Sequence, residues 1–344
     1  MRKYYFKLFP VFFVLISSLT FNHEVLLSKD IDHYRDFLIN NEKGHAQELH
    51  EKDFIRLFFK NNFGETRAHN RFKFKEYFID FKKYEYFKFG VSLENINVTN
   101  ESYLIKRQDK KNNDLIVYIG GHRFHPFKDG SIQKIINNQL FDDFDFLIHS
   151  LPMTDLYEFK HFEFVTKNNK KRKLEFANDH SFFGIVKTNY NLLSFFVDPV
   201  VKSANYFIKI NTYNNVILIG ESGGGLISFL SAPLIKNVSH NFTSSGVSFF
   251  NGVYESSDLN FLDLEQLDPI FFKEYLHEDV LNLSKSLMIE NHFFYNQNDK
   301  CCFDHRSYKT MEDTNTNSNL KLYLINSHDH GLNELTINII AKQI

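Results

Sequence analysis

Ser222 stands in a glycine-rich stretch whose residue types and spacing suit nucleophilic chemistry. The stretch Gly220-Glu221-Ser222-Gly223-Gly224 has the pattern G-x-S-x-G and lies between an apolar run and a second, helix-like apolar run. In that context a sharp strand-to-helix turn presents a serine hydroxyl as a nucleophile. A phosphate-binding turn is the alternative, but neither G-x-x-x-x-G-K-[ST] nor G-x-G-x-x-G with its acidic residue is present. The stretch therefore favours a nucleophilic serine over a turn former.

A nucleophilic serine needs a histidine base and an acid that orients this base. With this type of turn, the three residues follow the chain order serine, acid, histidine. Asp299 comes directly after one apolar run, and His328 and His330 follow the last one. The pattern predicts Asp299 as the acid, with Asp304 as a more distant alternative, and leaves two histidines as candidates for the base.

The elements that must position these residues alternate along the chain. Strands are expected at 115–119, 144–150, 216–219, 246–252, 292–297 and 320–326, and helices at 131–140, 191–210, 225–236 and from 332. Strands that alternate with helices of about ten residues indicate parallel βαβ units, so the fold class is α/β. Ahead of them, two short aromatic runs over 84–108 suit a hairpin.

The composition limits the kinds of partner. The chain has 344 residues, 43% of them hydrophobic, and a formal net charge of −2. One large core is therefore expected, and nucleic acid is not an expected partner. The two cysteines are adjacent, Cys301 and Cys302, and are expected to be thiols beside a loop. No C-x-x-C or H-E-x-x-H spacing occurs, so neither a metal site nor a cofactor is expected.

The N-terminus has the build of an export signal. A basic start with Arg2, Lys3 and Lys7 precedes an apolar run over 8–21. We therefore expect residues 1–25 to be a signal peptide or membrane anchor, the sole membrane contact of a secreted, periplasmic or anchored protein. Residues 26–82 are expected to form a helical extension and 83–344 the main domain, in which 255–287 is a possible small cap.

Three segments resemble the α/β-hydrolase superfamily: "GESGGG", "NQNDKCCF" and "SHDHGLNE". The resemblance covers roughly residues 84–344, and the glycine-rich motif with the aspartate before a cysteine pair looks like a poorly characterised group of bacterial hydrolases, some labelled esterases. It implies a mostly parallel central sheet with helices on both faces, to which the N-terminal helical extension is added.

The resemblance also implies roles for residues. Ser222 would attack an acyl carbonyl, and His330 would accept its proton because "DHG" resembles the usual family ending, with His328 as the alternative. Asp299 would hold the imidazole, with Asp304 as its alternative. The oxyanion hole would use the amide of Gly223 and a second donor, either Gly121 or His122, from the loop "GGHRFHP".

The expected function is that of a serine hydrolase that cleaves an ester or related acyl bond of a small molecule or carbohydrate without a cofactor. One alternative is a prolyl-oligopeptidase-like peptidase, although about eighty N-terminal residues cannot supply the propeller of such enzymes. The other is a non-catalytic surface protein that keeps the hydrolase fold for binding.

Overall fold

The computed structural model divides the chain into two compact units, residues 1–49 and 50–344. The residues that the structure describes all belong to the second unit. They are 67–69, 75–79, 82–93, 96–107, 113–122, 124–125, 128–152, 161–165, 170–175, 193–248, 277–301, 303–315 and 317–344.

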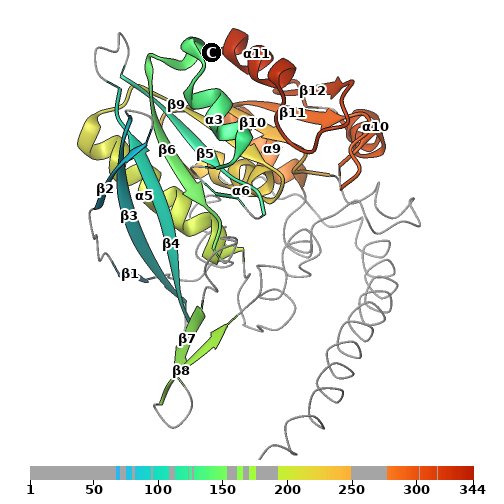
Figure 1. The fold of residues 1–344 in the computed structure, drawn as a ribbon. Helices are drawn as coiled ribbons and strands as arrows, with labels where there is room; N and C mark the ends of the chain where they lie inside the picture. The colour runs from blue at the N-terminus through green and yellow to red at the C-terminus, as the bar shows by residue number, and fades with distance from the viewer. Residues whose placement is uncertain are drawn as a thin grey trace, which may run out of the picture. The chain divides into compact units, whose positions relative to one another are not determined.

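A single twisted sheet organises this unit (Figure 1). Its main path runs β1-β3-β4-β6-β5-β9-β10-β11-β12. These strands are β1 (Arg67–His69), β3 (Lys82–Leu93), β4 (Ile96–Ile105), β6 (Phe144–Ser150), β5 (Asp114–Ile119), β9 (Asn215–Glu221), β10 (Val238–Ser244), β11 (Glu290–Asn296) and β12 (Leu320–Ile325). Strand β2 (Lys75–Ile79) pairs with β3, and the hairpin of β7 (His161–Val165) and β8 (Lys171–Glu175) pairs with β4. From β6 to β12 every neighbouring pair is parallel, whereas β3, β4 and β6 pair antiparallel.

Helices cover both faces of the sheet (Figure 1). The two faces have separate hydrophobic clusters. One contains residues of α5 (Ser194–Asn211), α6 (Gly223–Ser231), α9 (His277–Ser286) and α10 (His305–Thr314), and the other contains residues of α3 (Gly130–Ile136), the 3-10 turn Gln139–Phe141 and α11 (Glu334–Gln343). A further 3-10 turn, Ala232–Leu234, extends α6.

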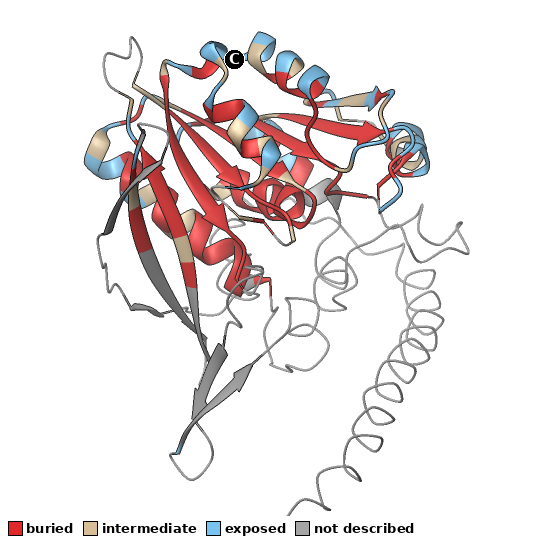
Figure 2. Cartoon of the chain, viewed as in Figure 1, coloured by how far each residue is buried: buried red, intermediate tan, exposed pale blue. Residues whose placement is uncertain are grey.

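The central strands contribute side chains to both hydrophobic clusters, because successive side chains alternate between the two faces of the sheet. In β5, Leu115 and Val117 belong to the first cluster, whereas Ile116 and Tyr118 belong to the second. Successive side chains of a strand point to opposite faces, so a strand covered on both sides must be apolar throughout. Figure 2 shows the central strands buried between helices whose outer surfaces are exposed. The prediction of a mostly parallel sheet with helices on both faces is confirmed.

One predicted strand is wrong. A strand was predicted at 246–252, but the strand that pairs with β9 is β10, Val238–Ser244. Residues 246–248 come after its carboxyl end, and 249–252 lie outside the described residues. The error has a physical cause, because β10 carries His240, Asn241 and Thr243 and so lacks the apolar run of a buried strand.

The predicted helical extension over 26–82 is wrong where it can be compared. Arg67–His69 and Lys75–Ile79 form the strands β1 and β2, because both pair antiparallel with the long β3. The rest of this segment and the predicted signal or anchor over 1–25 lie outside the described residues.

Of the possible cap over 255–287, only 277–287 is described. Its helix α9 buries Val280 and Leu281 in the core, so this part packs on the sheet. Across the described ranges, no helix combines the length and the apolar character that a bilayer crossing requires.

Candidate active site

The carboxyl ends of three strands bring the predicted residues together. Ser222 directly follows β9, Asp299 follows β11, and His330 lies in the loop after β12. These strands are linked through β10 by parallel pairing, so their carboxyl ends lie at the same edge of the sheet. Ligand sites of open α/β sheets form at this edge.

Short hydrogen bonds link the three side chains. His330 Nε2 lies 2.9 Å from Ser222 Oγ, and His330 Nδ1 lies 2.8 Å from Asp299 Oδ2. The Asp299 side chain is fully buried, whereas the His330 side chain is 30% exposed. An imidazole that contacts a hydroxyl on one nitrogen and a buried carboxylate on the other is set up to take the hydroxyl proton.

The turn at Ser222 has an unusual backbone. Ser222 has φ 55° and ψ −131°, values that a residue with a side chain rarely adopts. Gly220 and Gly224 permit the turn, because a Cβ on Gly220 would collide with the carbonyl of Gly224, and one on Gly224 with the carbonyl of Ile119. The glycines therefore let β5, β9 and α6 approach closely enough to place the serine at the sheet edge.

Buried amides hold the histidine loop. Asn296 Nδ2 donates to the carbonyl of Gly331, and Asn333 Nδ2 donates to Asn296 Oδ1. Asn333 also caps α11, since its Oδ1 accepts from the amide of Thr336. His330 is thus fixed between the end of β11 and the start of α11. Neither asparagine was predicted, because a single Asn at the end of a strand or the start of a helix gives no signal of such a role.

Glu221, immediately before the serine, is a partly buried acid, and no sequence pattern singled it out. Its carboxylate accepts hydrogen bonds from Tyr118 at 2.8 Å and from Ser131 at 3.2 Å. Burial, followed by repulsion from Asp129, raises the pKa of Glu221 to about 7. A Cβ on Gly331, whose φ is +90°, would collide with this side chain, so Glu221 packs directly beneath the histidine loop.

Two backbone segments surround the serine hydroxyl. Gly223 is the first residue of α6, whose leading amides have no partner within the helix. Gly121 lies on the other side, since a Cβ there would stand 2.7 Å from Ser222 Cβ and 3.4 Å from Ser222 Oγ. His122 follows in the same loop and is partly exposed. The predicted oxyanion segments therefore both border Ser222.

The alternative residues lie elsewhere. His328 is exposed, while His330 makes the contact to Ser222. Asp304 caps α10 by accepting from the amide of Arg306 and also pairs with the guanidinium of Arg306 at 2.8 Å.

The expectation of a thiol at Cys301 is wrong, because Cys301 is disulfide-bonded. The only other cysteine of the chain, Cys302, lies outside the described residues. Near the site, the amide of Cys301 donates to Asp299 Oδ1 at 2.8 Å.

A second serine–histidine contact has a different character. His149 is fully buried between Ser102 and Ser203, each of whose hydroxyls lies 2.8 Å from one ring nitrogen. Burial lowers the pKa of His149 to about 3, so the ring is neutral at pH 7. Since both nitrogens contact hydroxyls within the core, this group stabilises the fold and offers no access for a substrate.

Comparison with known proteins relates the fold to solved structures. No protein-family model matches the sequence, and no curated protein matches it. Acetyl xylan esterase 1 from Thermoanaerobacterium sp. JW/SL YS485 superposes with a TM-score of 0.52 at 13% identity, over 85% of this chain and 92% of the esterase. Acetyl xylan esterase from Paenibacillus sp. R4 superposes with a TM-score of 0.54 at 8% identity, over 88% of this chain and 98% of that one. Together with the strand order and the turn at Ser222, these similarities show that the chain has the fold of the α/β-hydrolase superfamily.

Proposed function

We propose that the protein is a serine hydrolase that cleaves an ester or a related acyl bond. The observation that carries the proposal is the continuous contact from Ser222 Oγ through His330 to Asp299, at 2.9 and 2.8 Å. The strained turn at Ser222 supports it, because unfavourable backbone conformations concentrate at functional sites.

The reaction has two stages. His330 Nε2 takes the proton of Ser222 Oγ as the oxygen bonds to the acyl carbon, and then gives this proton to the leaving alcohol as the ester bond breaks. Water attacks the acyl-enzyme in the second stage and releases the acid, which restores Ser222. Asp299 holds the imidazole tautomer that carries its proton on Nδ1. The amide of Gly223, with that of Gly121 or His122, stabilises the negative oxygen.

The proposed substrate is an acyl ester of a small molecule or a carbohydrate. Two of the structurally similar proteins are acetyl xylan esterases, which makes acetylated sugars the first compounds to test. The reaction as proposed uses no cofactor.

A fluorophosphonate probe with a panel of esters and amides tests the proposal. We expect the probe to label the purified protein at Ser222 and esters to be hydrolysed, with both lost in Ser222→Ala. Ser286→Ala, which changes an exposed serine, is the matched control and should behave as wild type. Preference for peptide amides over esters would favour the peptidase alternative. A folded protein that neither reacts with the probe nor turns over any ester would favour the non-catalytic binding protein.

We also propose that the N-terminal segment directs the chain across a membrane. The basic start and the apolar run over 8–21 support this, as in secretory signals. Fractionation and mass spectrometry of the N-terminus provide the test. Recovery of the full-length protein, with Met1 intact, from the cytosol would contradict export.

A further inference from the structure

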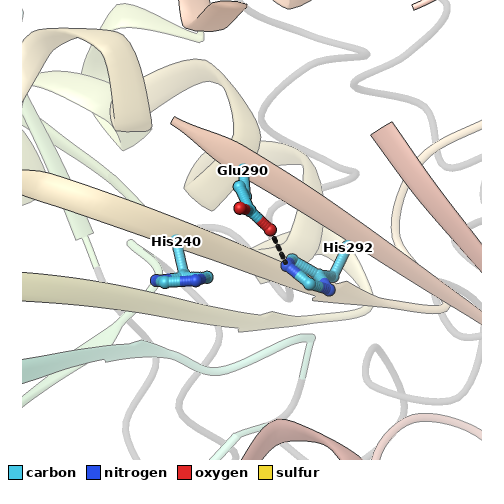
Figure 3. A group of neighbouring side chains, drawn as sticks. All are labelled: His240, Glu290 and His292. Atoms are coloured by element: carbon cyan, nitrogen blue, oxygen red, sulfur yellow. Dashed lines mark ion pairs between the residues drawn. The ribbon is translucent and has the colours of Figure 1, made fainter. Parts of the chain in front are cut away.

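A group of side chains far from Ser222 has the composition of a metal site. His240 on β10 and Glu290 and His292 on β11 offer ligand atoms that all lie within 4.8 Å of one another (Figure 3). Parallel pairing sets His240 opposite Glu290, and residues 290 and 292 share one face of β11 because side chains alternate along a strand. The three side chains therefore converge from neighbouring strands.

Each histidine of this group places its Nδ1 beside a hydroxyl oxygen. His240 Nδ1 lies 2.8 Å from Ser239 Oγ, and His292 Nδ1 lies 3.2 Å from Tyr323 Oη. Histidine ligands of metals characteristically use one nitrogen for the metal and donate the other N–H to a neighbouring oxygen. The pattern leaves Nε2 of both rings as the ligand atom.

His292 Nε2 is a buried polar atom without a hydrogen-bond partner. The His292 side chain is 0% exposed, and its Nε2 lies 3.5 Å from Glu290 Oε2 in the ion-pair geometry that Figure 3 marks. A buried polar group without a hydrogen bond costs about 1–3 kcal/mol, so such a group calls for an explanation.

We propose that His240, Glu290 and His292 bind a divalent transition metal ion of the zinc type. Two imidazole nitrogens and a carboxylate oxygen form a donor set that zinc accepts, with water completing the coordination. Ligands of tetrahedral zinc stand about 3.4 Å apart, which the His292–Glu290 separation of 3.5 Å already approaches. His240 and Glu290 are partly exposed, so their side chains can rotate inward and leave a path for the ion.

When no metal ion is bound, Lys321 neutralises the carboxylate of Glu290. Its Nζ lies 2.6 Å from Glu290 Oε2, and the Lys321 side chain is 45% exposed. A metal ion would compete with this ammonium for the carboxylate, and the exposed lysine can move into solvent. Lys321 thus weakens metal binding, so a variant without this ammonium should bind the metal ion more tightly.

The proposed site is separate from the catalytic residues. His240 precedes Ser244 by four positions, and Ser244 is paired with Glu221, next to Ser222. At 3.3 Å per residue, this separation is about 13 Å along the sheet. The metal would therefore connect β10 with β11 and stabilise the sheet without contacting a substrate. No sequence spacing indicates this site, because its ligands come from two strands and only Glu290 and His292 are close in the chain.

Titration of the untagged, chelator-treated full chain with Zn²⁺, followed by calorimetry, tests the proposal. We expect binding of one equivalent, with Co²⁺ giving the absorption spectrum of a site with nitrogen ligands. His240→Ala and Glu290→Gln should each weaken binding at least about tenfold, since even changes to outer-shell partners of metal ligands have effects of this size. His305→Ala, which removes an exposed histidine, is the matched control and should bind as wild type. Lys321→Gln should bind Zn²⁺ more tightly than wild type.

Thermal unfolding supplies a readout that does not depend on catalysis. Zn²⁺ should raise the melting temperature of wild type and of His305→Ala, but not that of His240→Ala, because a ligand that binds only the folded state stabilises it. The proposal is wrong if folded wild type binds no Zn²⁺. It is equally wrong if His240→Ala and Glu290→Gln retain wild-type affinity.

Discussion

Ser222 combines a positive φ of 55° with a hydroxyl 2.9 Å from an imidazole nitrogen. A serine that merely formed a turn would need neither, because glycine adopts positive φ at lower cost and needs no partner. The presence of serine instead of glycine at this position therefore indicates that the hydroxyl has a function. The backbone observation and the hydrogen bond are independent, and both point to the nucleophile proposed above.

Single substitutions in the proposed triad should be severe and non-additive. Ser222→Ala, His330→Ala and Asp299→Ala should each lower kcat by about 10³-fold or more, while the triple variant should lose little beyond the worst single change, because the residues act as one unit. Turnover of a reactive ester provides the measurement. His328→Ala is the matched control and should be mild. Mild loss for His330→Ala together with collapse for His328→Ala would transfer the role of base to His328.

Glu221→Gln should change how stability depends on pH. Burial raises the pKa of Glu221 to about 7 from an ordinary value of 4.5. The folded state thus holds this proton more tightly than the unfolded state, so the contribution of Glu221 to stability is fully present below pH 4.5 and is lost as the pH rises to 7. A neutral glutamine removes this loss. The free energy of unfolding of Glu221→Gln, relative to wild type, should therefore rise by about 3 kcal/mol across this window.

Urea unfolding at several pH values from 4.5 to 8 would measure the difference. Glu334→Gln is the control for loss of an exposed glutamate. A difference between Glu221→Gln and wild type that stays constant across the window would contradict the assignment.

The turn at Ser222 requires the start of α6 to lie close to the end of β5. Gly224→Ala should destabilise the protein by about 2 kcal/mol or more, because the new Cβ would collide with the backbone carbonyls of Ile119 and Gly120. Gly130→Ala is the matched control, since nothing lies within 4 Å of a Cβ there. The control should leave stability within about 1 kcal/mol of wild type. Equal effects of the two changes in chemical denaturation would contradict close packing at the turn.

The elements differ in how far the sequence predicted them. Strands β5, β9 and β12 have apolar runs bounded by polar or glycine residues, and their positions were predicted correctly. Strand β10 was missed because buried Asn241 is paired by a hydrogen bond at 2.9 Å with Asn291 of β11. A sequence displays the polar residue but not the partner that makes its burial tolerable. Asn296, which holds the histidine loop, was missed for the same reason.

At the scale of the whole molecule, the order of the strands brings residues that are distant in the sequence together at one edge of the sheet. Ser222, Asp299 and His330 could be selected from the sequence because each follows a strand, and parallel strands end at a common edge. The group of His240, Glu290 and His292 could not be found in this way, because its members lie within strands. Its formation depends on the register between β10 and β11, which no local pattern encodes.

Stability of the whole molecule in acid should depend strongly on His149. Burial lowers its pKa to about 3, below the ordinary value of 6.5. The unfolded state therefore takes up the proton more readily, so the contribution of His149 to stability is complete above pH 6.5 and is lost as the pH falls toward 3, by about 5 kcal/mol in total. Glu221 acts with the opposite sign, and the two effects oppose each other between pH 4.5 and 6.5.

Replacement of His149 by glutamine isolates this contribution, because the amide keeps polar atoms beside Ser102 and Ser203 but has no proton to gain in this range. His149→Gln should be less stable than wild type at pH 7, since its shape fits the core less well, but should lose less stability per pH unit below 6.5. Chemical denaturation from pH 7 to 4 measures this slope, and His305→Gln, at an exposed position, should keep the wild-type slope. Parallel curves for wild type and His149→Gln would mean that a group other than His149 drives acid unfolding.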